Sequence, residues 1–274
     1  MMKFLFNILI LIVITFSFSS CRTITYGTDP ALIGELYNFK KILVKGGDFW
    51  ITTYQKITDP DMPYVFYIEG DGAAFNGKYR VSHNPTPRNQ MMLNLAAMDK
   101  RPNVVYVARP CQYTPMDLNP TCTNQYWTGK RLSDDSVQAL NETINSINRN
   151  GKFSIIGYSG GGGIAVLIAA RNSNVKDIIT IAGNLDIQSF TTFHSVTPMI
   201  GSLNPIDYAN QVRDIPQLHL SGGKDKVVPP FIADKFVQEA SSTCVKQQIF
   251  VDATHRDGWK QIWEYIYTKP LICY

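Results

Sequence analysis

The chain has 274 residues, of which 45% are hydrophobic and 18% charged, and its formal net charge is +4. This length and composition suffice for one large core, and α/β domains of this size commonly form a single unit. The lysines and arginines are scattered along the chain, which excludes a dense basic nucleic-acid surface and indicates an ordinary solvated one.

The first twenty residues have the pattern of a secretory signal. Lys3 precedes an uncharged apolar run, residues 4–18, and two serines follow that run. The run is shorter than the roughly 20 apolar residues that span a bilayer, so a cleaved signal is favoured over an uncleaved anchor. We therefore expect a signal peptide over residues 1–20 and a mature domain over residues 21–274.

Cys21 is the first residue of that mature chain, and Phe18-Ser19-Ser20-Cys21 resembles the lipobox of bacterial lipoproteins. The resemblance implies that Cys21 is lipidated, so that its acyl chains tether the protein to a membrane without spanning it. Phe18 replaces the usual leucine, which leaves conventional signal cleavage as the alternative. Arg22 stands where aspartate favours inner-membrane retention in enteric bacteria. The expected location is the periplasm or the outer membrane of a bacterium.

Four further cysteines form an even set, as expected for disulfide bonds in an oxidising compartment: Cys111, Cys122, Cys244 and Cys273. Three pairings are possible. Cys111 and Cys122 bracket one proline-containing loop, which favours a local bond and leaves Cys244 for Cys273. No Cys-x-x-Cys or His-x-x-x-His spacing occurs, so a metal site is not expected.

Apolar strand-like runs alternate with helical patterns along most of the chain. Strands are predicted at 49–57, 64–68, 104–107, 153–156, 178–182, 218–220 and 248–251. Helices are predicted at 133–147, with Ser133 as the N-cap, at 163–170 and at 259–267. This alternation predicts a mostly parallel central sheet with helices on both faces. Such sheets place their active sites at the carboxyl ends of the strands.

The strand at 153–156 runs into Gly157-Tyr158-Ser159-Gly160-Gly161, and a helix follows. A Gly-x-Ser-x-Gly turn between a strand and a helix presents the serine hydroxyl, and the amide of Gly160 can donate to a developing oxyanion. By itself the turn also fits two other interpretations. Gly160-x-Gly162-x-x-Ala165 satisfies a degenerate dinucleotide-binding fingerprint, and glycine turns can be purely structural.

Residues at later strand ends favour a hydrolase, because a serine nucleophile needs a general base and that base needs an orienting acid. Asp225 lies in the loop 221–229 after one strand, and His255 follows the last strand. Asp186, after the preceding strand, is an alternative acid. The order serine, acid, histidine and the Gly-x-x-Asp-x-x-Val-Pro pattern of that loop resemble the α/β-hydrolase family.

The resemblance implies a two-step acyl transfer that needs no metal or organic cofactor. Ser159 attacks a carbonyl, His255 takes the serine proton, and Asp225 stabilises the imidazolium. The Asp71 or Gly72 amide is expected as the second oxyanion donor, since many esterases carry His-Gly at the corresponding turn. An Asp71 carboxylate would oppose an oxyanion, so its side chain is expected to point away or to bind a substrate cation.

Two insertions are expected to select the substrate. The first is the loop 109–128, which carries Tyr113 and Trp127, and the second is a short cap over about 184–212, which carries Phe190. Tyr158, beside the serine, is a further expected contact.

A small-molecule carboxylic ester is the leading expected substrate, and an amide or peptide is the second, because the same triad serves both. A non-catalytic surface-binding lipoprotein and a dinucleotide-dependent reductase are the rival interpretations. No nucleic-acid partner is expected. The expected membrane contact is the N-terminal lipid anchor.

Overall fold

The computed structural model of the protein describes residues 30–77 and 80–273. The predicted signal peptide and the predicted lipidation site at Cys21 lie outside the described residues. Within these ranges, none of the helices combines the length and the apolar character that crossing a bilayer requires.

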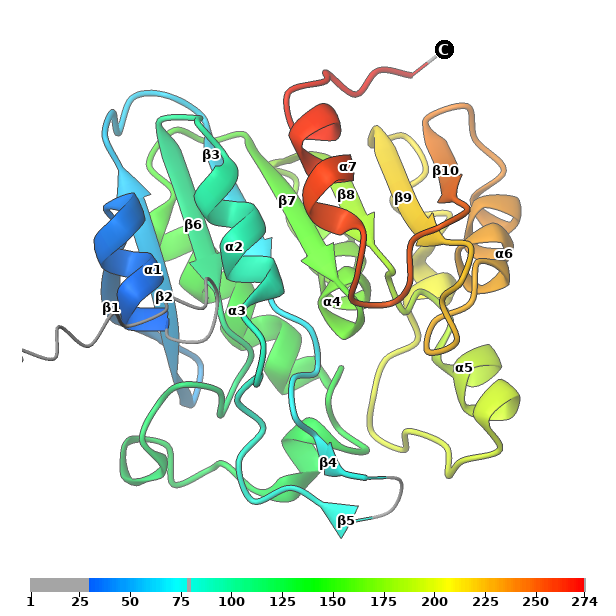
Figure 1. Cartoon of the computed structure of the whole chain (residues 1–274), viewed down its shortest axis with the longest axis horizontal. Helices are drawn as coiled ribbons and strands as arrows, with labels where there is room; N and C mark the ends of the chain where they lie inside the picture. Colours follow the sequence, from blue (N-terminus) through cyan, green and yellow to red (C-terminus); the bar gives the residue numbers. More distant parts are fainter. Residues whose placement is uncertain (1–29, 78–79, 274) are drawn as a thin grey trace, which may run out of the picture.

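A sheet of eight strands forms the centre of the molecule (Figure 1). Its spatial order is β1-β2-β6-β3-β7-β8-β9-β10. The pairings from β6 through β10 are all parallel, whereas β2 is antiparallel to both of its neighbours. The strands are β1 (Lys40–Gly46), β2 (Phe49–Ile57), β3 (Tyr64–Ile68), β6 (Asn103–Val107), β7 (Phe153–Tyr158), β8 (Val175–Ile181), β9 (Gln217–Gly222) and β10 (Val245–Phe250).

Burial along the strands explains this order. Every residue of β3, β6 and β7 is buried, which fits their place in the middle of a sheet that is covered on both faces. The burial of β10 is incomplete, as expected for an edge strand. All strands predicted from the sequence are present. β1 was not predicted, and neither was the small hairpin of β4 (Phe75–Asn76) and β5 (Arg80–Val81).

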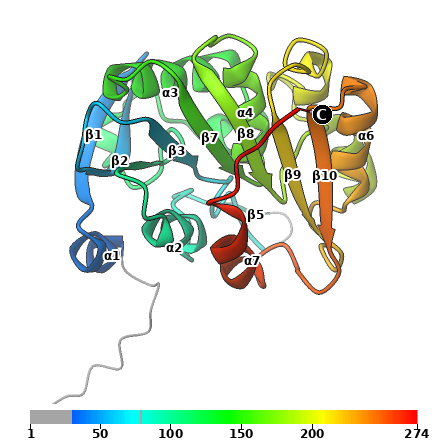
Figure 2. The same cartoon turned by 90° about the horizontal axis from the view of Figure 1, so that it is seen from above.

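Helices cover both faces of the sheet (Figure 2), which confirms the predicted fold class. One face carries α1 (Pro30–Tyr37), α2 (Met91–Met98) and α7 (Trp259–Ile266), and the other carries α3 (Asp134–Ile147), α4 (Gly160–Ala169) and α6 (Phe231–Ala240). Each face has its own hydrophobic cluster. The predicted N-cap of α3 is present, because the Ser133 hydroxyl accepts a hydrogen bond from the Ser136 amide.

The loops at the carboxyl ends of the parallel strands gather on one side of the sheet (Figure 1). The hairpin of β4 and β5 lies there, as do the loop after β6 and α5 (Ile187–His194). The loop after β6 contains η1 (Met116–Leu118) and η2 (Asn124–Trp127). The segment 184–212 contains α5 and η3 (Pro205–Tyr208). The predicted catalytic side chains are therefore expected on this side of the sheet.

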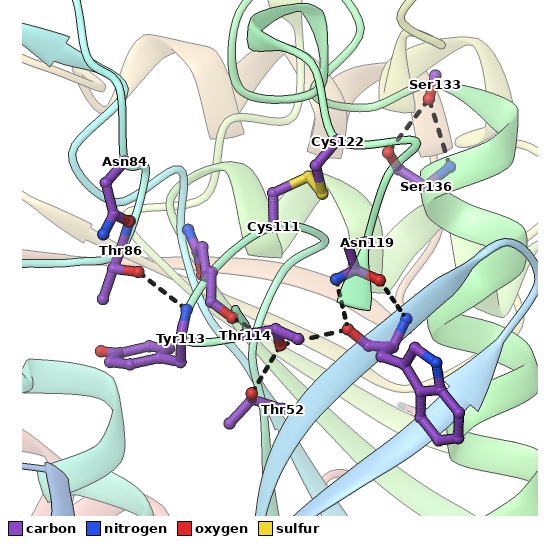
Figure 3. The surroundings of a disulfide bond; sticks show 12 residues. Thr52, Asn84, Thr86, Cys111, Tyr113, Thr114, Asn119, Cys122, Ser133 and Ser136 are labelled. Carbon is purple, nitrogen blue, oxygen red and sulfur yellow. Dashed lines mark hydrogen bonds between the residues drawn. A yellow bond between two sulfur atoms is a disulfide. The ribbon is translucent and has the colours of Figure 1, made fainter. Parts of the chain in front are cut away.

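Two disulfide bonds join Cys111 to Cys122 and Cys244 to Cys273, which is the pairing expected from the sequence. The first bond closes the loop after β6 (Figure 3). Hydrogen bonds fix that loop to β2. The Asn119 side chain accepts from the Trp50 amide through Oδ1 and donates to the Trp50 carbonyl through Nδ2. The Thr52 and Thr114 hydroxyls lie 2.8 Å apart. The second bond ties the C-terminal segment to the start of β10.

Removing the first disulfide in Cys111→Ser/Cys122→Ser is expected to lower the free energy of unfolding by about 2–3 kcal/mol, since the bond restricts the unfolded chain. Urea denaturation measures this loss. Cys244→Ser/Cys273→Ser is the matched comparison: its bond spans 29 residues instead of 11. Its loss is therefore expected to be about 1 kcal/mol larger. An unchanged urea midpoint in the first variant would show that Cys111 and Cys122 are not bonded in the native protein.

Candidate active site

Ser159 lies in a sharp turn between β7 and α4. Its φ is +52°, a conformation that is strained for a residue with a side chain. The chain passes so close to itself that a Cβ atom on Gly157 would lie 2.2 Å from the carbonyl oxygen of Gly161. The neighbouring segment holds the turn in place, since the Ser159 amide donates to the Ile181 carbonyl and the Ser159 carbonyl accepts from the Asn184 amide. The turn therefore presents the hydroxyl at the edge of the sheet.

Three side chains from different strand ends form one chain of hydrogen bonds. The distance from Ser159 Oγ to His255 Nε2 is 3.1 Å, and the distance from His255 Nδ1 to Asp225 Oδ2 is 2.8 Å. The other Asp225 oxygen accepts from the Val227 and Val228 amides at 2.7 and 2.8 Å. Asp225 thereby keeps its second oxygen for the histidine. The structure brings together the three residues that the sequence analysis selected.

The backbone of His255 is fixed as well as its ring. Its carbonyl oxygen accepts hydrogen bonds from the Tyr158 hydroxyl at 3.0 Å and from Trp259 Nε1 at 3.1 Å. The Tyr158 ring lies 5.1 Å from the imidazole, centroid to centroid. These contacts orient the imidazole toward Ser159. The alternative acid, Asp186, has another role, because its carboxylate caps α5 through the amides of Gln188 and Ser189.

The two predicted oxyanion donors lie on adjacent turns. Gly160 is the first residue of α4, where the amide groups have no partner within the helix. Asp71 follows β3, which pairs with β7 so that Ile68 lies beside Gly157. The two turns touch: a Cβ atom on Gly160 would come within 2.0 Å of Asp71 Oδ1. A larger residue at position 160 would have to displace the Asp71 carboxylate, which lies directly beside the predicted oxyanion donor Gly160.

This position of the Asp71 side chain differs from both expectations, because it neither points away nor waits for a substrate cation. Two arginines of the chain already pair with it. Arg131 Nη1 lies 2.9 Å from Oδ2, and Arg109 Nη1 lies 3.4 Å from Oδ1. Burial raises the pKa of Asp71, but the charges of Arg131 and Arg109 outweigh burial, and the pKa lies below its usual value. The carboxylate stays ionised and its charge is compensated.

Glu69, at the end of β3, is a second buried carboxyl group in the site. One oxygen accepts a hydrogen bond from the Gly70 amide at 2.8 Å, and the other accepts one from the Tyr106 hydroxyl at 2.7 Å. Burial raises the pKa of Glu69 to about 7, although the hydrogen bonds from Tyr106 and Gly70 and the charge of Arg109 act in the opposite direction. Glu69 holds the start of the turn that carries Asp71.

A cavity of about 410 Å³ opens beside Ser159 and His255. Tyr158, Phe190 and Val227 contribute apolar surface to it. Arg88, Arg131 and Arg256 also line the cavity, together with Glu69, Asp71 and Asn184. Its wall is therefore partly aromatic and strongly charged. Across residues 30–77 and 80–273, no cluster of three or more histidine, cysteine or acidic side chains could hold a metal ion.

Of the three predicted substrate contacts, only Tyr158 lines this cavity. The Tyr113 hydroxyl donates to Gln90 at 2.6 Å, and its amide donates to Thr86 (Figure 3). Trp127 Nε1 donates to the Ser82 carbonyl at 3.0 Å. Both aromatic side chains join the loop after β6 to the segment 82–90. Tyr113 and Trp127 therefore do not line the cavity beside Ser159, and their contact with substrate stays a prediction.

The sequence analysis missed several residues of the site. Asn184 and Arg256 could have been found from their positions, since one follows β8 at the carboxyl edge of the sheet and the other adjoins His255. Arg131 carries no local signal, because it lies 60 residues from the aspartate with which it pairs. Its role depends on how the loop after β6 returns to the site.

A sequence model of the family described as "Serine hydrolase (FSH1)" matches residues 79–256. This range covers more than half of the chain and contains Ser159, Asp225 and His255. No curated protein sequence matches the chain.

Solved structures share the fold at low sequence identity. An esterase of Pyrococcus furiosus is 12% identical over 85% of this chain and 90% of that one, with a TM-score of 0.59. The acylaminoacyl peptidase of Pyrococcus horikoshii is 16% identical over 79% of this chain but only 38% of its own, with a TM-score of 0.56. A puromycin-hydrolyzing peptidase of Mycobacterium tuberculosis is 17% identical over 80% and 36%, with a TM-score of 0.57. At these identities the likeness concerns the fold alone.

The raised pKa of Glu69 predicts a pH dependence of stability. The unfolded chain loses this proton near pH 4.5, whereas the native protein keeps it until about pH 7. The native state thus binds more protons between these values, and the free energy of unfolding falls as the pH rises, by about 3 kcal/mol in total. Glu69→Gln removes this contribution. Urea denaturation at pH 4.5 and pH 8 is expected to show a smaller decline in the variant.

Glu239→Gln serves as the control for this measurement, since Glu239 is exposed on α6 and far from the turn after β3. It is expected to keep the decline of the wild-type protein. Equal pH dependence in Glu69→Gln and the wild-type protein would contradict the assignment of the proton to Glu69.

Proposed function

Because the chain belongs to the serine hydrolase (FSH1) family, we propose that it hydrolyses carboxylic esters through an acyl-enzyme formed on Ser159. The observation that carries this proposal is the continuous hydrogen-bond chain from Ser159 through His255 to Asp225, which opens into a cavity. A hydroxyl with a base at its oxygen and an acid behind that base is the arrangement that activates a serine.

In the first step, Ser159 Oγ attacks the ester carbonyl carbon while its proton moves to His255 Nε2, 3.1 Å away. Asp225 accepts a hydrogen bond from Nδ1–H of the same ring, which fixes the tautomer and stabilises the imidazolium. The imidazolium then protonates the leaving alcohol as the carbon–oxygen bond breaks. Water attacks the acyl-enzyme by the reverse path, which releases the carboxylic acid and restores Ser159.

The Gly160 and Asp71 amides are the proposed donors to the oxyanion of both tetrahedral intermediates. The contact between their turns and the anchoring of Gly70 by Glu69 support this assignment. The Asp71 carboxylate beside them would repel the oxyanion if it stood alone. Arg109 and Arg131 supply two positive charges against its single negative charge, so the cluster favours an anion.

Amide or peptide hydrolysis is the second candidate, because the structurally similar proteins include two peptidases. The chain spans little more than a third of the length of those peptidases, whereas it spans 90% of the Pyrococcus furiosus esterase. This difference in coverage supports the ester as the first candidate.

A fluorophosphonate probe tests the nucleophile. We expect the wild-type protein to be labelled and Ser159→Ala to be unlabelled, with Ser146→Ala, an exposed serine on α3, as the matched control. With p-nitrophenyl esters, Ser159→Ala and Asp225→Asn are expected to lose roughly 10⁴-fold in kcat. Labelling that survives Ser159→Ala would refute the proposal. Faster cleavage of aminoacyl anilides than of the esters would favour the peptidase.

We also propose that residues 1–20 are removed and that lipidated Cys21 holds the enzyme at a membrane of the cell envelope. The two disulfide bonds support export, because such bonds persist in oxidising compartments. The lipobox-like sequence before Cys21 supports the lipid anchor.

Cys21→Ser is expected to shift the enzyme from the membrane fraction to the soluble fraction of a bacterial host, because the acyl acceptor is lost. Immunoblots of the two fractions measure the shift. Ser19→Ala is the control, since it keeps both the cysteine and a small residue before the cut. Unchanged membrane association of Cys21→Ser would refute lipidation at this residue.

A further inference from the structure

The cavity beside Ser159 carries more positive charge than the proposed chemistry requires. Three arginines line it, Arg88, Arg131 and Arg256, of which Arg88 and Arg256 are exposed. Of the two acidic residues in its wall, Asp71 is already paired with Arg131 and Arg109. Glu69 is buried and held by Tyr106 and Gly70, and its raised pKa of about 7 leaves it only partly ionised at neutral pH. Neither acid neutralises the other two arginines.

Arg88 and Arg256 have no carboxylate within 4.0 Å in the described part of the chain. Arg88 donates to the amide oxygen of Asn76, a neutral partner. Arg256 directly follows His255, and its backbone amide bonds Thr254. One arginine comes from the segment after β5 and the other from the loop after β10, so two separate parts of the chain bring unpaired cations to one cavity.

A buried polar group also belongs to this wall. Asn184 is 1% exposed and lines the same cavity, and its side-chain oxygen has no hydrogen-bond partner among the described residues. A buried amide oxygen without a partner costs about 1–3 kcal/mol, and this cost is borne beside the nucleophile. The backbone N–H of Asn184 donates to the Ser159 carbonyl, so the Asn184 side chain belongs to the segment that adjoins the nucleophile.

A plain alkyl ester does not match this wall. It carries no charge that could pair with Arg88 or Arg256. A carboxylate matches it, because guanidinium groups bind carboxylates through paired, charge-assisted hydrogen bonds. A cavity lined by one sign of charge also concentrates ligands of the opposite sign. Phe190 and Val227 belong to the same wall and can contact an apolar spacer between the anion and the reacting carbonyl.

We propose that the preferred substrates are esters whose acyl part carries a second, anionic group, and that Arg88 and Arg256 bind this group. The proposal rests on the proposed ester hydrolysis at Ser159. Arg88 and Arg256 act on substrate selection, whereas Ser159, His255 and Asp225 carry out the chemistry.

A pair of substrates of equal length tests the proposal. One is the p-nitrophenyl monoester of adipic acid, which ends in a carboxylate, and the other is the corresponding adipamic ester, which ends in a neutral amide. We expect kcat/KM to be at least tenfold higher for the carboxylate at low ionic strength, after subtraction of the spontaneous rate. The advantage is expected to shrink at 0.5 M NaCl, because salt screens the attraction.

Variants locate the effect. Arg88→Gln and Arg256→Gln are each expected to reduce the carboxylate-to-amide ratio of kcat/KM severalfold, and the double variant is expected to bring it near one. Arg149→Gln removes an arginine that does not line the cavity and is expected to keep the wild-type ratio. Melting temperatures close to that of the wild-type protein show that the variants are folded.

Equal rates for the two esters in the wild-type protein, or a preference that survives in the double variant, would overturn the proposal. Ser159 labelled by the fluorophosphonate without a preference for the carboxylate overturns this inference and leaves the hydrolase intact. Absence of both labelling and ester hydrolysis refutes the proposed function, and the inference falls with it.

Discussion

The strained turn at Ser159 is the constraint on which the site depends. A left-handed serine costs about 1–3 kcal/mol, and such a conformation persists only where its surroundings over-determine it. Here β7 is buried on both sides, α4 begins one residue later, and backbone bonds to Ile181 and Asn184 hold the turn. Gly157 and Gly161 are needed because the backbone passes too close to itself for a Cβ atom at either position.

The parallel sheet converts this local turn into an active-site geometry. Because β3, β7, β8, β9 and β10 run in one direction, the loops that follow them end at the same edge. Such loops carry Asp71, Ser159, Asp225 and His255. The formation of the sheet therefore brings these four residues to one edge. The cost of this convergence is electrostatic. It places the Asp71 carboxylate beside Gly160 at the start of α4, and Arg109 and Arg131 compensate its charge.

Local patterns predicted the sheet and the hydrogen-bonded trio for a physical reason. Buried parallel strands are continuous apolar runs, and the turns after them are marked by glycine, so both signals lie within a few residues. β1 escaped prediction because it is an exposed edge strand with three lysines among its seven residues. The hairpin of β4 and β5 is too short to show any periodicity. The contacts of Tyr113 and Trp127 with Gln90 and Ser82 were not predicted, because an aromatic side chain in a loop does not reveal which neighbour it packs against.

The sequence by itself determined the class of fold, the order of the strands' functional residues and the even set of cysteines, because each of these is written in local spacing. Only the tertiary structure decided which charges face one another. The contact of Asp71 with Gly160, its pairing with Arg131 and the presence of Arg88 and Arg256 in one cavity depend on segments that meet across the end of the sheet. The Ser159 turn could be predicted from neighbouring residues in the sequence. The charges of the cavity around it come from residues that are distant in the sequence and close in the folded structure.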